Sequence, residues 1–315
     1  MKVLLTGAFG NIGSSAIVEI VRKGYELRCF DLPTRRNQQA ARRLTREADF
    51  EIVWGDLRNN EDVAKAVSGC DVVAHIGFII PPHVDRNPAV AEAVNVGGTR
   101  NILDNLNGAK LIFASSVATY GDMHDVPPPR KATDPQTPTD AYTEHKIQCE
   151  QMIRESDIVW SIFRFSAVQP LNLGNVDPLM FEVPLDQRIE FLDTRDAGLA
   201  IANGVGHEEI WYKTLLIAGG NANQMVYDDY IGKIFDAIGV GRLPPRAFTT
   251  TRFHTDWMDT EESQALLQYQ RYSFDEFIEE LMRRLGIRRT LASKMPGIVK
   301  WWLLRQSPYY KKDRS

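Results

Sequence analysis

Three glycines near the start of the chain constrain its fold more than any other feature. Gly7, Gly10 and Gly13 come directly after a short apolar run, Val3–Leu5. The apolar residues that follow repeat at helical spacing: Ile12, Ala16, Ile17, Ile20 and Val21. A second apolar run then ends in Asp31. Strand, glycine turn, helix, strand and acid follow one another in the order that holds a dinucleotide.

Each of these residues has a physical task at such a site. Gly7 permits the tight turn, Gly10 lets the backbone approach a pyrophosphate, and Gly13 lets the helix lie close to the strand. The amides of the first helical turn then face the phosphate oxygens. Asp31 favours NAD, because its carboxylate accepts from the ribose hydroxyls and repels the extra phosphate of NADP. Arg35 and Arg36 follow closely and keep NADP as the less favoured alternative.

Composition and charge narrow the class of protein further. The chain has 315 residues, of which 43% are hydrophobic and 25% charged, as in an ordinary globular protein. Its net charge of −4 gives no reason to expect nucleic-acid binding. Three scattered cysteines give no disulfide framework, and the histidines show no metal-ligand spacing, so we expect no metal. We predict a cytoplasmic protein, because the first strand leaves no room for a signal peptide and no apolar run spans a bilayer.

Strand and helix patterns alternate through the first half. The expected strands are 2–7, 26–31, 50–55, 71–77, 110–115 and 157–164, and the expected helices are 12–23, 35–47, 60–68, 88–106 and 140–155. This alternation predicts an α/β fold with a doubly wound parallel sheet of the Rossmann type. Ligands of such sheets bind beyond the carboxyl ends of the strands, so we expect the site there.

The second half is less regular and suggests a division into three parts. Residues 1–165 form the expected NAD-binding Rossmann domain. Residues 166–288 form a smaller, interleaved substrate lobe, of which part of 190–220 returns to the sheet. In it, 188–205 reads as a strand and a helix, 213–220 as a strand, and 227–238, 261–268 and 273–285 as helices. Residues 289–315 form a basic, aromatic tail.

Two further stretches carry chemistry. The strand at 110–115 runs into Ser116, and Tyr142 and Lys146 lie four residues apart on an expected helix. A nearby ammonium lowers the pKa of a tyrosine, and such a tyrosine can move a proton to or from a hydroxyl. A serine can hold the same substrate oxygen. Opposite a nicotinamide, these groups equip a site for hydride transfer at a carbinol carbon.

With these residues the sequence resembles the extended short-chain dehydrogenase/reductase family, of the NAD-dependent epimerase/dehydratase type, over about residues 1–240. The matching segments are Thr6–Gly13, Gly55–Leu57, Val73–Gly77, Asn95–Thr99, Ser115–Gly121, Tyr142 with Lys146, and Arg195-Asp196. The resemblance implies a catalytic set of Ser116, Tyr142 and Lys146, and a homodimer built on the helices near 88–106 and 140–155. It implies cofactor contacts from Gly7, Gly10, Asn11, Ile12, Gly13, Asp31, Asp56, Leu57, His75, Gly77, Asn95, Tyr142, Lys146 and Val168. We expect His75 to be a packed residue that shapes the cofactor crevice.

Two departures from the family pattern bear on the substrate. After the sixth strand Ala167 and Gln169 replace an asparagine and a tyrosine, and the usual glycine hairpin is missing before Arg195. The segment offers instead Leu171, Leu173, Met180 and Phe181, which suit a small or apolar molecule. We therefore predict an NAD-dependent oxidoreductase that interconverts a secondary alcohol and a ketone on a small molecule. The alternatives are a nucleotide-sugar epimerase or dehydratase with transient hydride transfer and, from another class, a non-catalytic dinucleotide sensor.

The end of the chain is strongly basic. From Arg283 to Ser315 ten Lys or Arg face one acid, Asp313, which gives this part +9 and leaves −13 for the rest. Trp301 and Trp302 lie within it. Such a segment can make peripheral contact with an anionic membrane, or it can neutralise the acidic body of its own chain or of a partner subunit.

Overall fold

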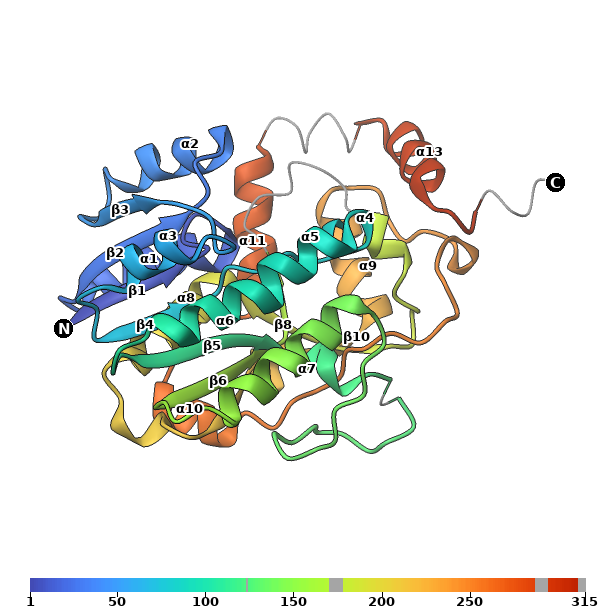
Figure 1. Ribbon diagram of the computed structural model, residues 1–315. Coiled ribbons are helices and arrows are strands. Elements are labelled where there is room, and N and C mark those ends of the chain that lie inside the picture. Colours follow the sequence, from blue (N-terminus) through green and yellow to red (C-terminus); the bar gives the residue numbers. More distant parts are fainter. Residues whose placement is uncertain (123, 170–177, 287–293, 311–315) are drawn as a thin grey trace.

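The computed structural model describes residues 1–315 apart from 123, 170–177, 287–293 and 311–315 (Figure 1). Its main layer is a seven-stranded sheet in the order β3-β2-β1-β4-β5-β6-β9, with every neighbouring pair parallel. The strands are β1 (Lys2–Thr6), β2 (Glu26–Asp31), β3 (Glu51–Trp54), β4 (Val72–His75), β5 (Lys110–Ser116), β6 (Trp160–Phe165) and β9 (Thr214–Ile217). The strand order reverses between β1 and β4, which is where such sheets bind ligands. The predicted doubly wound α/β fold is confirmed.

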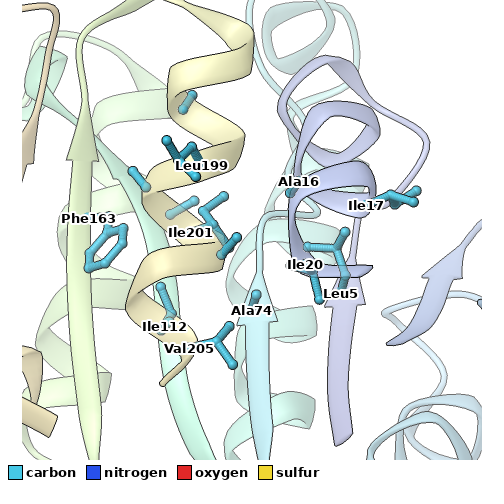
Figure 2. Close-up of a cluster of buried hydrophobic side chains, with 14 of the residues drawn as sticks. Leu5, Ala16, Ile17, Ile20, Ala74, Ile112, Phe163, Leu199, Ile201 and Val205 are labelled. Atoms are coloured by element: carbon cyan, nitrogen blue, oxygen red, sulfur yellow. The ribbon is translucent and has the colours of Figure 1, made fainter. Parts of the chain in front are cut away.

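Helices cover both faces of this sheet. One face carries α1 (Asn11–Arg22), α2 (Arg35–Leu44) and α8 (Thr194–Val205). Figure 2 shows the core on this side, where side chains of α1 and α8 lie over β1, β4, β5 and β6. The other face carries α3 (Asn60–Val67), α6 (Gly98–Asn105) and α7 (Ala141–Arg154). Apolar side chains on both faces explain the nearly continuous apolar runs of the strands.

The helix expected over 88–106 is divided. It consists of α5 (Pro88–Glu92), a π-helical turn over Ala93–Gly97, and α6, and the short α4 (His83–Arg86) precedes it. The π turn contains the fully buried Asn95, whose amide bonds both the N–H and the C=O of Ile79. A π turn has hydrogen bonds between residues i and i+5, one residue more than in an α-helix. Here the Asn95 side chain in this turn reaches the loop after β4.

A second, three-stranded sheet has the order β10-β8-β7. It contains β7 (Ala167–Gln169), β8 (Arg188–Asp193) and β10 (Gln224–Val226), with β8 parallel to β7 and antiparallel to β10. An aromatic core lies against it, with Phe181, Phe191, Tyr230, Phe274 and Phe277 among its members. The remaining helices are α9 (Tyr227–Ala237), α10 (Glu261–Leu267), α11 (Phe274–Leu285) and α13 (Pro296–Gln306). Short 3₁₀ turns cover Val117–Tyr120, Pro178–Phe181, Glu208–Ile210, Asn221–Asn223 and Pro245–Ala247.

The two sheets are joined through α8. The chain leaves β8 of the small sheet, forms α8 and then returns to the large sheet as β9, beside β6. A Cβ at Gly198 on α8 would lie 2.6 Å from the carbonyl carbon of Ser15 on α1. The Thr194 hydroxyl lies 3.2 Å from that of Ser15 and donates to the Asn11 carbonyl at 3.1 Å. The helix that begins at the glycine turn is therefore packed tightly by a later part of the chain.

Among the described helices, none combines the length and the apolar character needed to cross a membrane.

Candidate active site

The glycine turn has the close approaches that its sequence predicts. Gly7 has a φ of +63°, and a Cβ there would lie 2.7 Å from the backbone of Gly77 in the loop after β4. A Cβ at Gly13 would lie 2.4 Å from the Gly7 carbonyl oxygen. Gly10 precedes the first residue of α1 and donates its N–H to Gly7. Side chains at Gly7 and Gly13 would break the turn, because their Cβ atoms would meet backbone.

Asp31, at the end of β2, bonds to the backbone of the glycine turn. Its carboxylate accepts the Phe9 N–H at 3.0 Å, the Leu32 N–H at 2.8 Å and the Asn37 side-chain amide at 2.9 Å. Burial raises the pKa of Asp31, and the bonds from Phe9 and Leu32 partly oppose that rise. The carboxylate thus ties the second strand to the turn, and it has lone pairs left for further donors.

A chain of hydrogen bonds joins β1, β4 and α6 through buried side chains. The Thr6 hydroxyl is 2.7 Å from Nδ1 of His75, and Nε2 of His75 is 3.1 Å from the Thr99 hydroxyl. Burial, with a smaller effect of Lys146, lowers the pKa of His75 to about 3, so the imidazole is neutral. Both ring nitrogens are engaged with protein groups, and the Asn95 amide is engaged with Ile79. In the structure these two expected cofactor residues therefore bond to other protein groups.

The other expected cofactor residues lie around the same sheet edge. Asn11 and Ile12 begin α1, and Val168 lies in β7 opposite Leu192 of β8. Leu57 packs against two glycines, since a Cβ at Gly98 or Gly77 would lie within 3.0 Å of its side chain. The carboxylate of Asp56 pairs with Arg58 at 2.5 Å, which lowers its pKa.

The three expected catalytic residues come together. Ser116 ends β5, and its side chain shares a hydrogen bond with that of Tyr142 on α7. Lys146 follows one helical turn later, is 3% exposed, and donates from Nζ to the Ala114 carbonyl at 2.5 Å. Asp140 fixes the start of α7, because its carboxylate accepts the Thr143 N–H in a reciprocal cap. The site therefore presents a serine, a tyrosine and a lysine at the carboxyl edge of the sheet.

The electrostatics differ from the expectation that Lys146 lowers the pKa of Tyr142. Burial raises the pKa of Tyr142 to about 12, only partly offset by the hydrogen bond with Ser116. The Lys146 amine lies 5.9 Å from the Tyr142 ring centre and 3.4 Å from that of Phe78. Burial also lowers the pKa of Lys146 to about 7, so the amine is only partly protonated at neutral pH. Desolvation outweighs charge attraction at both groups.

Sequence reasoning missed the ion pair that supports this helix. Glu150, fully buried, accepts from Arg164 through both carboxylate oxygens at 2.9 and 2.7 Å. It also accepts from the Ser115 hydroxyl at 2.5 Å, which joins α7 to β5 and β6. The signal was present in the sequence, because Tyr142, Lys146 and Glu150 repeat every four residues on one helical face.

The apolar wall of the site comes from the loop after β4. Phe78 contacts Tyr142 edge to face, with ring centres 5.9 Å apart, and Ile80 in the same loop is 53% exposed. The segment after β6 behaves differently from the expectation. Phe181 is fully buried in the aromatic core, with Met180 packed against it. Leu171 and Leu173 lie outside the described residues.

Known proteins resemble this chain in sequence, mainly over its first half. Residues 3–168 match the model of the NAD dependent epimerase/dehydratase family. A UDP-glucose 4-epimerase of Lacticaseibacillus casei is 27% identical over 184 residues, which is 56% of this chain and 53% of that protein. A 3 beta-hydroxysteroid dehydrogenase/Delta 5-->4-isomerase of Mycobacterium tuberculosis is 28% identical over 191 residues, 57% of this chain and 49% of that protein. The matches span about half the length of these curated relatives.

Solved structures resemble the whole fold at lower identity. The crystal structure of a UDP-glucose-4-epimerase from Stenotrophomonas maltophila, with bound NAD and formylated UDP-arabinopyranose, superposes with a TM-score of 0.78 at 18% identity. That match covers 92% of this chain and 99% of the other. A short-chain dehydrogenase/reductase superfamily protein from Agrobacterium tumefaciens with bound NAD gives 0.71 at 21% identity, over 94% and 99%. These likenesses extend the agreement in fold to the second half.

Proposed function

The chain belongs to the NAD dependent epimerase/dehydratase family, and we propose that it acts on a nucleotide sugar by transient hydride transfer. The observation that carries this proposal is the meeting of Ser116, Tyr142 and Lys146 at the carboxyl edge of the sheet that bears the glycine turn. UDP-glucose 4-epimerases and a CDP-paratose 2-epimerase among the relatives favour this reading over net oxidation of an alcohol. Phe181 is buried in the aromatic core and Met180 is partly buried against it, which weakens the argument from these two residues for an apolar substrate.

The residues have distinct proposed roles. The Ser116 hydroxyl and the Tyr142 phenol hold the substrate hydroxyl, and the phenolate form of Tyr142 takes its proton. Bound NAD supplies the acceptor for the hydride that leaves the same carbon. Lys146 would hold the nicotinamide ribose, as the family resemblance implies. In an epimerase, return of the hydride to the opposite face of the carbonyl carbon, with return of the proton from Tyr142 to the oxygen, would invert the carbon and restore every group.

One observation favours a second candidate, net oxidation of an apolar secondary alcohol. Phe78 forms an apolar wall beside Tyr142, and Ile80 of the same loop is exposed. Such surface suits a flat apolar ring better than a sugar hydroxyl face. The hydroxysteroid dehydrogenases among the relatives are consistent with this alternative.

The nicotinamide absorbance separates the two candidates. The protein with NAD is incubated with uridine, cytidine and thymidine diphosphate sugars and, separately, with a 3β-hydroxysteroid. Epimerisation gives a new sugar without net absorbance change, whereas net oxidation gives one reduced nicotinamide per product. A productive ligand at a hundred times its dissociation constant should stabilise the protein by about 2.7 kcal/mol.

Tyr142→Phe should remove either activity. Turnover of the steroid with stoichiometric reduced cofactor would replace the epimerase proposal with the second candidate. Absence of turnover and of stabilisation by every compound would contradict both and favour a dinucleotide sensor.

We also keep the homodimer as a prediction for the same enzyme. The apolar positions expected at the interface lie on α5, the π turn and α7, and all are at least partly exposed: Val90, Ala93, Val94, Ile147 and Met152. Sedimentation equilibrium at micromolar concentration should give twice the mass of the chain. A monomer would contradict this prediction.

A further inference from the structure

The helix α13 has two apolar faces, of which the protein covers one. Leu303 is 1% exposed in the core of the small sheet, with Val299 and Leu304 packed beside it. Past the helix end, the Ser307 hydroxyl donates to the Ala247 carbonyl at 2.6 Å. These contacts fix the inner face of α13 on the rest of the molecule. In Figure 1 the helix lies at the outer edge, beyond α9 and far from β1–β3.

The outer face of α13 is apolar and exposed. Met295, Ile298, Trp301 and Trp302 are between 45% and 56% exposed. The spacing of Ile298, Trp301 and Trp302 places these three on one side of α13, and Met295 caps the start of the helix beside them. Ten large apolar side chains are strongly exposed in the described part of the chain, and four of them form this patch, which we name the tryptophan face. Clustering of this kind marks an interaction surface, whereas single exposed apolar residues do not.

Basic side chains lie within the tryptophan face itself. Arg305 shares this side of α13 by its spacing, and its guanidinium lies 4.7 Å from the Trp301 ring centre. Lys294 is exposed and directly precedes Met295, the residue that caps the helix. The sequence from Lys294 to Tyr310 contains no acid, and the whole part after residue 282 carries +9 against −13 elsewhere. Charged groups are depleted from the centres of protein–protein interfaces. Tryptophan mixed with Lys and Arg is instead typical of helices that lie in the headgroup region of a membrane.

We propose that the tryptophan face docks this protein onto an anionic lipid surface. The indoles and Ile298 enter the headgroup boundary, while Lys294 and Arg305 meet lipid phosphates and carboxylates. The strongly acidic remainder of the chain is repelled by the same surface, so contact through α13 fixes one orientation of the molecule. This proposal concerns a surface remote in sequence from the catalytic residues and does not depend on the substrate.

Flotation with vesicles tests the proposal on the full chain. We expect binding to vesicles of phosphatidylcholine with phosphatidylserine, weakened by salt, and little binding to phosphatidylcholine alone. Both the double variant Ile298→Ser/Trp302→Ser and the double variant Lys294→Gln/Arg305→Gln should bind more weakly, on the order of tenfold. The matched control is Tyr212→Ser, which removes an aromatic side chain that is 62% exposed but lies outside the patch. Because all these side chains are exposed, thermal midpoints and solution turnover should stay unchanged.

Three results would overturn the proposal. The first is no binding to the anionic vesicles. The second is binding that survives unchanged in Ile298→Ser/Trp302→Ser. The third is self-association without lipid that this variant abolishes, which would assign the face to a second copy of the chain.

Discussion

Each of the two sheets has a buried titratable side chain, and the two side chains differ in how many hydrogen bonds they make. Lys146, packed against the large sheet, has one donated bond to a carbonyl, and no salt bridge to it forms in the described part of the chain. Glu190, in the small sheet, accepts from the Gly220 and Met258 N–H groups, both at 2.7 Å, and from Gln224 at 3.1 Å. The ammonium of Lys146 therefore has few compensating bonds, and it lies where we expect the reaction to occur. The carboxyl of Glu190 instead bonds to three other segments of the chain. Both groups have strongly shifted pKa values, so the number of bonds each makes distinguishes them better than the shift does.

The two groups also give opposite dependences of stability on pH. Burial lowers the pKa of Lys146 from 10.5 to about 7, so the unfolded chain binds more protons between these values and stability rises with pH there. Burial raises the pKa of Glu190 from 4.5 to about 7, so its contribution is present below 4.5 and is lost as pH rises to 7. The two contributions together are least favourable near neutral pH.

The largest expected effect comes from Tyr142→Phe, which tests whether the first region is the catalytic one. Turnover should fall by about 10²–10⁴-fold, because the phenol that moves the proton is lost. NAD affinity and the thermal midpoint should change little, since the ring still packs against Phe78. Steady-state kinetics and calorimetry measure the two parts, with Tyr212→Phe as the control. A rate within a few-fold of wild type would remove Tyr142 from the proposed mechanism.

Lys146→Met sharpens the contrast, because it should stabilise the protein while it inactivates the enzyme. Removing a buried, poorly compensated ammonium should raise the free energy of unfolding at pH 7 by roughly 1–2 kcal/mol. It should also flatten the rise in stability between pH 7 and 10. Denaturant unfolding at a series of pH values without cofactor measures both. A variant less stable than wild type with the slope intact would show that Lys146 is well compensated after all.

Asp31→Asn tests a carboxylate of the large sheet that, unlike Lys146, makes several hydrogen bonds. The amide keeps one acceptor oxygen for the turn but removes the charge that faces the expected ribose. NAD should bind more weakly by about tenfold, or about 1.4 kcal/mol, and NADP should be discriminated less. Calorimetric titration with each cofactor measures both. Asp104→Asn, which alters an exposed carboxyl on α6, is the control, and equal losses in the two variants would refute the assignment of Asp31.

Glu190→Gln should have the smallest effect at neutral pH and the clearest effect on the acid slope. The decline in stability between pH 4.5 and 7 should become shallower, because one of the groups that titrate there is gone. At pH 7 the change should stay within about 1 kcal/mol, since relief of charge burial is offset by an amide N–H that faces donors. Turnover should remain within a factor of about two. Unfolding curves that keep the wild-type acid slope would assign that slope to other carboxyls, such as Asp196, whose pKa burial raises to about 6.

Much of the first region could be predicted, because its features are set by backbone constraints. Gly7, Gly13 and the apolar strands predicted the fold, which is confirmed, and the family, the enzyme class and NAD are confirmed by the family match. The small sheet could not be predicted as a whole, because β7 and β10 have three residues each, too few to show alternation. The pKa of Tyr142 was predicted in the wrong direction, since spacing shows a neighbour but not the desolvation of the two groups. The site residues and the three-part division stay predictions.

The tight packing of Gly198 against Ser15 limits how this chain can be divided or recombined. A chimera in which everything after residue 165 came from a relative would also have a foreign α8. It would lose Gly198, the glycine that packs against α1. A side chain in its place would push α1 outward and displace the turn that begins it. Exchange between relatives is therefore expected to preserve cofactor affinity only when 194–217 stays with the first half. The segments that can be exchanged are 166–193 and 218–288, which precede and follow residues 194–217.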